Sequence, residues 1–138
     1  MEKMQFDSGV QRFRVNGGGV LTFHPQDPNL YGRFHQMGSR LTEIEKMLDR
    51  QEGQDVLTLM ALADRELKKE LNGVFPGNDF ENLLAGVNLL AVTKNGKTVL
   101  ENFIDALTPI LCQGAEKCAE HYAQEAASKA QGRREMQC

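Results

Sequence analysis

The sequence predicts a mainly α-helical single domain of four to five helices with an N-terminal β-hairpin. Three observations carry this prediction: β-rich runs flank the glycine-rich segment 16–19, apolar residues recur at helical spacing from Leu30 to Leu48, and a capping box stands at Thr98. With 138 residues, of which 41% are hydrophobic and 25% charged, the chain has the length and composition of one globular domain.

The N-terminal region is predicted to be a flexible lead-in over 1–9 followed by the hairpin. Its strands are expected at 10–15 and 20–24, where Phe13 alternates with arginines as a half-buried strand requires. The Asn-Gly pair within 16–19 accepts the positive φ of a tight hairpin turn. A phosphate-binding loop is disfavoured, because no Gly-Lys-Ser/Thr follows and the next element is predicted to be a strand. Because an isolated hairpin is marginally stable in water, this one is expected to pack on helices or on another copy of the chain.

The first helix is predicted to begin at Asp27-Pro28, where Asp27 caps the free amides and Pro28 fits the first helical position. Apolar side chains then form one narrow seam along this helix. The members of the seam are Leu30, Phe34, Met37, Leu41, Ile44 and Leu48. A seam of this width predicts pairing with one long partner helix, either within the monomer or between copies. Gly53 is the predicted stop.

The second helix is predicted from Asp55 to Gly73, as the antiparallel partner of the first. A short helix is expected after the following turn, with Asn78 as its cap and Glu81 three residues further on. The pattern does not decide whether 87–92 continues as helix or runs extended.

The next helix is predicted to begin at a capping box formed by Thr98 and Glu101. Pro109 is expected to kink or end it, and Gly114 marks a predicted break. A separate, weakly anchored helix is expected after the break, because its least polar face consists of small side chains, and a polar tail at 131–138 follows it. The predicted organisation is a lead-in at 1–9, a helical domain at 10–114, and a C-terminal helix with its tail at 115–138.

The densest apolar run extends from Val74 to Leu111 and is predicted to supply the internal core. Phe75, Phe80 and Phe103 lie within this run and are expected to belong to the core, while aliphatic residues are expected to supply most of it, because tryptophan is absent and aromatic residues are few.

Charge and hydropathy disfavour several classes of function. A net charge of −3 with both signs interspersed offers no basic stripe for nucleic acid. Apolar runs fall far short of the ~20 residues that cross a bilayer. The N-terminus lacks the apolar core of a signal peptide, so a cytoplasmic protein is expected, with neither membrane nor nucleic acid as its partner.

The cysteines offer no convincing reactive site. Cys112, Cys118 and Cys138 include no CxxC pair and are expected to be free thiols. Cys118 and His121 lie one helical turn apart, but a zinc site needs four ligands and a nucleophile needs an oriented base. We therefore predict no catalytic residue, cofactor or metal, and expect a protein that is not an enzyme; a pocket gathering Cys112, Cys118 and His121 would reverse this expectation.

The order of motifs carries a family resemblance. The hairpin ends in Thr22–Pro28, a helical pair follows, and then come Val74–Asp79 and Asn102–Ile110. This order resembles the tail assembly chaperones of long-tailed bacteriophages and prophages, which often carry an N-P-x-D segment, an F-G turn and a late F-x-x-x-x-x-P helix. The resemblance covers most of 10–111. The chain departs from the pattern in two places, because His24 stands where Asn is usual and Pro76 separates the Phe from the Gly.

The resemblance implies a non-catalytic protein of the host-cell cytoplasm that binds the long helical tape-measure protein, keeps it soluble and helps to recruit tail-tube subunits. It also implies self-association. The candidate residues for contact with the client or with another copy are Leu30, Phe34, Met37, Leu41 and Ile44. The alternative is a small helical adaptor or regulatory protein that dimerises through the same first helix.

Overall fold

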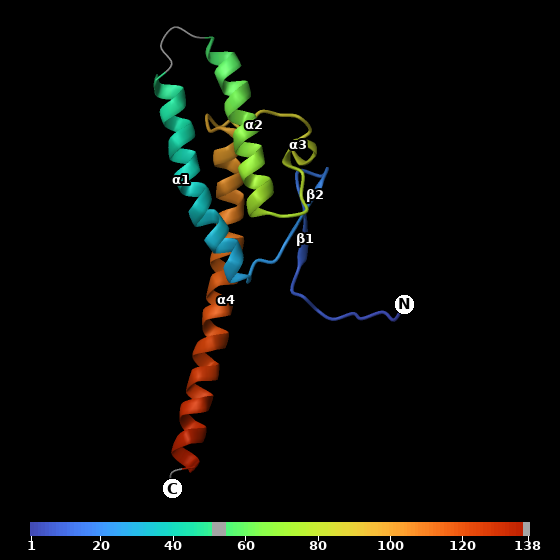
Figure 1. Cartoon of the computed structure of the whole chain (residues 1–138), viewed down its shortest axis with the longest axis vertical. Coiled ribbons are helices and arrows are strands. Elements are labelled where there is room, and N and C mark those ends of the chain that lie inside the picture. Colours follow the sequence, from blue (N-terminus) through green and yellow to red (C-terminus); the bar gives the residue numbers. More distant parts are fainter. Residues whose placement is uncertain (51–54, 137–138) are drawn as a thin grey trace.

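A pair of antiparallel helices, a β-hairpin and one long C-terminal helix make up the fold (Figure 1). A computed structural model describes residues 1–50 and 55–136 of the chain. The predicted fold class, mainly helical with an N-terminal hairpin, is confirmed. The elements are β1 (Gln11–Arg14), β2 (Val20–Phe23), α1 (Pro28–Arg50), α2 (Val56–Val74), α3 (Phe80–Leu83) and α4 (Val99–Met136).

The hairpin forms where the Asn-Gly signal predicts it. Asn16 and Gly17 have φ angles of 51° and 73°, and the amide of Gly18 donates to the carbonyl of Val15 at 2.9 Å, as in a type I′ turn. The strands pair in antiparallel register, and Phe13 of β1 stacks on Phe23 of β2 with ring centroids 4.8 Å apart. Each strand is shorter than predicted. The stacked pair directs one face of the hairpin toward the helices.

The helices α1 and α2 lie side by side and antiparallel, as the seam predicts (Figure 1). The carboxylate of Asp27 accepts from the amide of Asn29 at 3.0 Å, and that of Asp55 accepts from Leu57 at 3.1 Å, so both helices begin at capping aspartates. The second ends at Val74 and not at Asn72-Gly73, because the amide of Phe75 still donates to the carbonyl of Leu71 at 2.9 Å. The predicted stop at Gly53 lies outside the described residues.

Asn78 does not cap α3, which corrects the prediction. Asp79 is the cap, and its carboxylate accepts from the amide of Glu81 at 3.1 Å. The amide side chain of Asn78 instead reaches β2, where it accepts from the N–H of Thr22 and donates to the carbonyl of Thr22, both at 2.9 Å. Asn78 therefore occupies the outer edge of β2 as another strand would. The segment 87–92 forms turns, with an isolated bridge between Val92 and Thr98.

The long helix α4 begins at the predicted capping box. The amide of Glu101 donates to the hydroxyl of Thr98 at 3.1 Å, and the amide of Thr98 donates to the carboxylate of Glu101 at 3.2 Å. The helix then continues through Pro109 and Gly114 to Met136, so the predicted break was wrong. Proline removes one backbone donor, and the alanine-rich sequence that follows favours helix strongly enough to continue.

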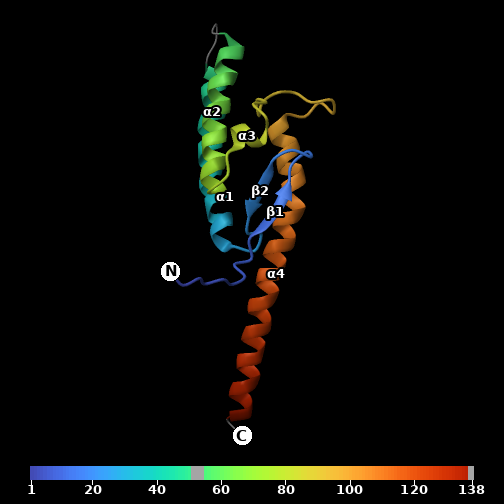
Figure 2. The same cartoon turned by 90° about the vertical axis from the view of Figure 1, so that its right-hand side faces the viewer.

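Gly114 marks a close contact between α4 and the start of α1. A Cβ atom on Gly114 would lie 2.1 Å from the carbonyl oxygen of Pro25, so only glycine allows this approach. Beside this contact, the hydroxyl of Tyr31 lies 2.9 Å from the Pro25 carbonyl and within hydrogen-bond distance of the Leu111 carbonyl. Beyond this junction α4 projects from the body of the molecule in both views (Figures 1 and 2). The first part of the predicted polar tail belongs to this helix, and residues 137–138 lie outside the described part of the chain.

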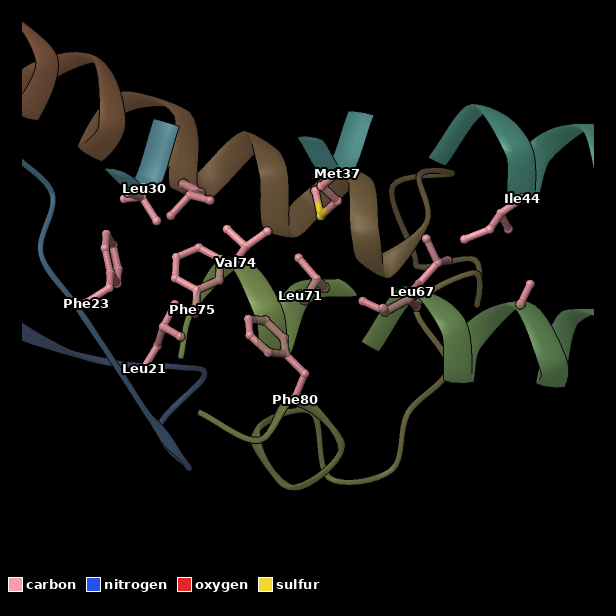
Figure 3. Close-up of a cluster of buried hydrophobic side chains, with 13 residues drawn as sticks. Leu21, Phe23, Leu30, Met37, Ile44, Leu67, Leu71, Val74, Phe75 and Phe80 are labelled. Atoms are coloured by element: carbon pink, nitrogen blue, oxygen red, sulfur yellow. The ribbon is translucent and has the colours of Figure 1, made fainter. Parts of the chain in front are cut away.

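The core lies where α1, α2, α3 and the hairpin meet (Figure 3). Phe75 and Phe80 are fully buried, and Phe103 packs against them from α4, which agrees with the predicted core role of these three residues. Phe75 is the hub, with edge-to-face contacts to Phe23 and Phe34 at centroid distances of 5.2 and 5.4 Å. The hairpin and the helix pair are thereby joined through one aromatic cluster.

A partly buried polar cluster, in which Lys68 and Asp64 are buried and Glu81 is exposed, attaches α3 and the following turns to α2. The ammonium of Lys68 lies 2.8 Å from the carboxylate of Asp64 and 2.7 Å from that of Glu81. Asp64 also accepts from the amide of Leu89 at 2.8 Å. Burial lowers the pKa of Lys68, but the hydrogen bonds and charges of its two carboxylate partners outweigh burial, and the net pKa is raised. Lys68 is therefore a charged, fully paired cation within the structure.

Candidate protein-binding groove

The seam on α1, which the sequence offered as a protein-binding surface, faces the interior. Leu30, Met37 and Ile44 are buried, and Phe34 and Leu41 are half-buried against the same core. Of the two predicted arrangements, pairing within the monomer and pairing between copies, the structure shows the first. A partner reaches these five side chains only if α1 separates from its neighbours, so their role in protein binding stays a prediction that this fold does not favour.

A different apolar surface is open to solvent. It is a groove of about 430 Å³ between the hairpin and α4, which lie next to each other in Figure 2. The groove is lined by Phe13, Arg14, Val15, Asn16, Leu21, Phe23, Leu84, Thr93, Val99, Asn102, Phe103, Ala106, Leu107 and Ile110. Most of these side chains are apolar, which is the character of a surface that receives apolar groups of a ligand or of another protein.

The base and the walls of the groove come mainly from the hairpin and α4. Leu21, Phe23 and Leu107 are buried and form its base. Phe13 on the hairpin side is half-buried, and on the α4 side Ala106 is exposed. Within the described residues the sheet contains β1 and β2 alone, so no third strand lies beside β1 at the hairpin wall of the groove.

Polar contacts hold one end of the groove in shape. The side-chain amide of Asn102 donates to the hydroxyl of Thr93 at 2.8 Å, and the same hydroxyl lies 2.8 Å from the carbonyl of Lys97. These bonds attach the turn at 93–97 to the first turns of α4. The groove is therefore a shaped apolar surface with a polar border.

Sequence patterns alone do not reveal this groove. Its walls come from residues that are far apart in the chain, such as Phe13 and Ile110. The sequence feature that could have indicated it is in α4, where Ala106 makes the apolar stripe of the helix wider than packing against one neighbour requires.

The cysteine and histidine candidates are not gathered into a pocket. Cys112 is exposed and Cys118 half-buried as free thiols, while His121 is exposed and lies 3.9 Å from Glu125. Cys138 lies outside the described residues. Within residues 1–50 and 55–136, no group of three His, Cys, Asp or Glu side chains is placed to hold a metal ion. No helix of that same part of the chain is long and apolar enough to cross a membrane.

Comparison of the chain with protein-family models, with curated proteins and with solved structures gave no match.

Proposed function

We propose that this protein is a non-catalytic assembly chaperone of the phage-tail type, which binds apolar helical segments of a tape-measure protein, keeps them soluble and helps to bring tail-tube subunits to them. The proposal joins the motif order of the sequence to one structural observation, the open apolar groove between the hairpin and α4. An amphipathic client helix places the apolar side chains of one face into such a groove while its polar face stays in water.

The shape and chemistry of the groove support a chaperone role in particular. Its lining is aliphatic and aromatic, with few polar groups that would select one client sequence. Contacts of this kind are non-directional and tolerate several registers of a repetitive helical client. The burial of Leu30, Met37 and Ile44 argues against the alternative of an adaptor that dimerises through α1, because that seam is already covered within the monomer.

Co-expression with a tape-measure fragment tests the proposal. Ala106 is exposed and lines the groove, so Ala106→Glu adds a carboxylate there without removing a core side chain. Ala123 is exposed on the same helix beyond the groove, which makes Ala123→Glu the matched control. We expect the wild type and Ala123→Glu to keep the fragment in the soluble fraction and Ala106→Glu to lose it.

Equal thermal unfolding of the two variants establishes that both are folded. The proposal fails if Ala106→Glu solubilises the fragment as well as the wild type does, or if the wild type itself leaves the fragment insoluble.

A further inference from the structure

The N-terminal segment 1–7, which we call the arm, carries apolar side chains that the described part of the chain leaves exposed. Met4 and Phe6 are 85% and 78% exposed, and Met1 is also fully exposed. The arm extends away from the body of the molecule in both views (Figures 1 and 2). Apolar side chains that gather on an exposed segment are typical of a surface that contacts another molecule.

The exit of the arm from the body is set by its neighbours. Gly9 has a φ of 80°, and a Cβ atom there would lie 2.3 Å from the imidazole of His24. The backbone at Gly9 therefore passes directly against this ring. The carboxylate of Asp7 accepts from the amide of Gly9 at 2.8 Å and stabilises this turn. The imidazole is itself held, because it accepts from the amide of Gln26 at 3.0 Å. This geometry points the arm away from its own hairpin.

The hairpin has one occupied edge and one open edge. On β2, Asn78 bonds both backbone groups of Thr22. On β1, the amide of Val15 donates to the carbonyl of Gly19. In an antiparallel pair, residues alternate between those whose backbone groups bond the partner strand and those whose groups point away from it. The backbone groups of Arg12 and Arg14 therefore point away from β2. Within the described residues the sheet contains β1 and β2 alone, and its β1 edge is therefore free to accept an extended segment.

The arm matches this edge in pattern and charge. Met4 and Phe6 share one face of an extended strand, and Asp7 lies on the other. On β1, the side chain of Phe13 lines the groove, and the exposed Arg12 and Arg14 alternate with it along the strand, so their side chains belong to the opposite face of the hairpin. A strand added here with its apolar face toward the groove brings Asp7 to the side that carries the two arginines.

We propose that the arm of one copy adds to the β1 edge of a second copy and places Met4 and Phe6 in the groove of that copy. Because each copy then offers one arm and one groove, the contact is head-to-tail, and it builds chains of subunits unless the rotation between neighbours closes them into a ring. The proposal uses the same groove as the proposed function but does not depend on any client being bound there.

Light scattering after size exclusion, over a range of concentrations, tests the proposal. Phe6→Ser removes the aromatic group of the arm and Ala106→Glu blocks the groove, while Gln5→Ser alters the opposite face of the arm as a matched control. We expect the mass of the wild type and of Gln5→Ser to grow with concentration. Each of the other variants alone is expected to associate at least about thirty-fold more weakly, as for loss of a central aromatic contact.

A mixture of the two defective variants gives the sharper result. Phe6→Ser retains an intact groove and Ala106→Glu retains an intact arm, so together they are expected to form one-to-one dimers that do not grow into longer chains. A wild type that stays monomeric, a Phe6→Ser variant that associates normally, or a mixture without dimers each overturns the proposal. A monomeric wild type that still solubilises the tape-measure fragment overturns the arm contact and leaves the proposed function standing.

Discussion

Lys68 shows how one buried charge organises its surroundings. Its ammonium joins Asp64 on the same helix to Glu81 on α3, while Asp64 holds the amide of Leu89. Removing the cation leaves the carboxylate of Asp64 buried without its ion-pair partner, which costs more than the pair itself contributes. The stability of the α2–α3 region therefore depends on the charge of a single side chain.

We expect Lys68→Met to lower the free energy of unfolding by about 3 kcal/mol, a cost typical of breaking a buried ion pair. Because the pKa of Lys68 is raised in the folded state, its contribution is complete below its unfolded pKa of roughly 10.4 and is lost as pH rises through the folded pKa. Urea unfolding at a series of pH values measures both effects. A difference between wild type and Lys68→Met that stays constant up to strongly alkaline pH would contradict this assignment.

The placement of α4 depends on a glycine that local patterns misassign. Glycine near the end of an apolar stripe is a common helix stop, and the prediction of a break at Gly114 followed that rule. The structure instead uses the missing side chain to bring the helix onto the carbonyl of Pro25, beside Tyr31. The neighbour that makes glycine necessary lies far away in sequence, so no local pattern contains it.

Gly114→Ala and Gly38→Ala are expected to have opposite effects on stability. Both positions lie inside helices, where alanine is favoured over glycine by about 1 kcal/mol. At Gly38 the added methyl group has no atom within 4 Å apart from its chain neighbours and the backbone of its own helix. Gly38→Ala is therefore expected to raise the free energy of unfolding. At Gly114 the methyl group meets the Pro25 carbonyl, and we expect a net loss of about 1–3 kcal/mol. Thermal unfolding compares them, and stabilisation by both substitutions would show that α4 adjusts freely at this contact.

Features that depend on neighbours in sequence were predictable, and features that depend on distant neighbours were not. The capping box at Thr98 and the turn at Asn16 are set by residues a few positions apart, and both form as predicted. Asn78 was assigned to the nearest helix end, yet its partner Thr22 is 56 residues away. The groove also depends on distant neighbours, because Phe13 and Ile110 line it together only when the core has joined the hairpin to the helices.

In the whole molecule, the proposed arm contact and the proposed client share one groove, so they are expected to compete. Adding a soluble tape-measure fragment to wild-type chains should lower the average mass measured by light scattering, with each bound fragment releasing one arm. The Ala123→Glu variant, which retains the groove, should respond like the wild type. An average mass that rises by the mass of the bound fragment, without release of subunits, would show that client and arm occupy different surfaces.

The projecting part of α4 also governs how the molecule moves in solution. This helix has 38 residues and is therefore about 57 Å long at about 1.5 Å per residue. A particle with such a projection experiences more drag than a sphere of equal mass, so it sediments slowly and leaves a sizing column early. A monomer will accordingly elute at the position of a larger sphere, and its rotational diffusion will be strongly anisotropic, which a fluorescent probe at the exposed Tyr122 position would report as slow end-over-end tumbling.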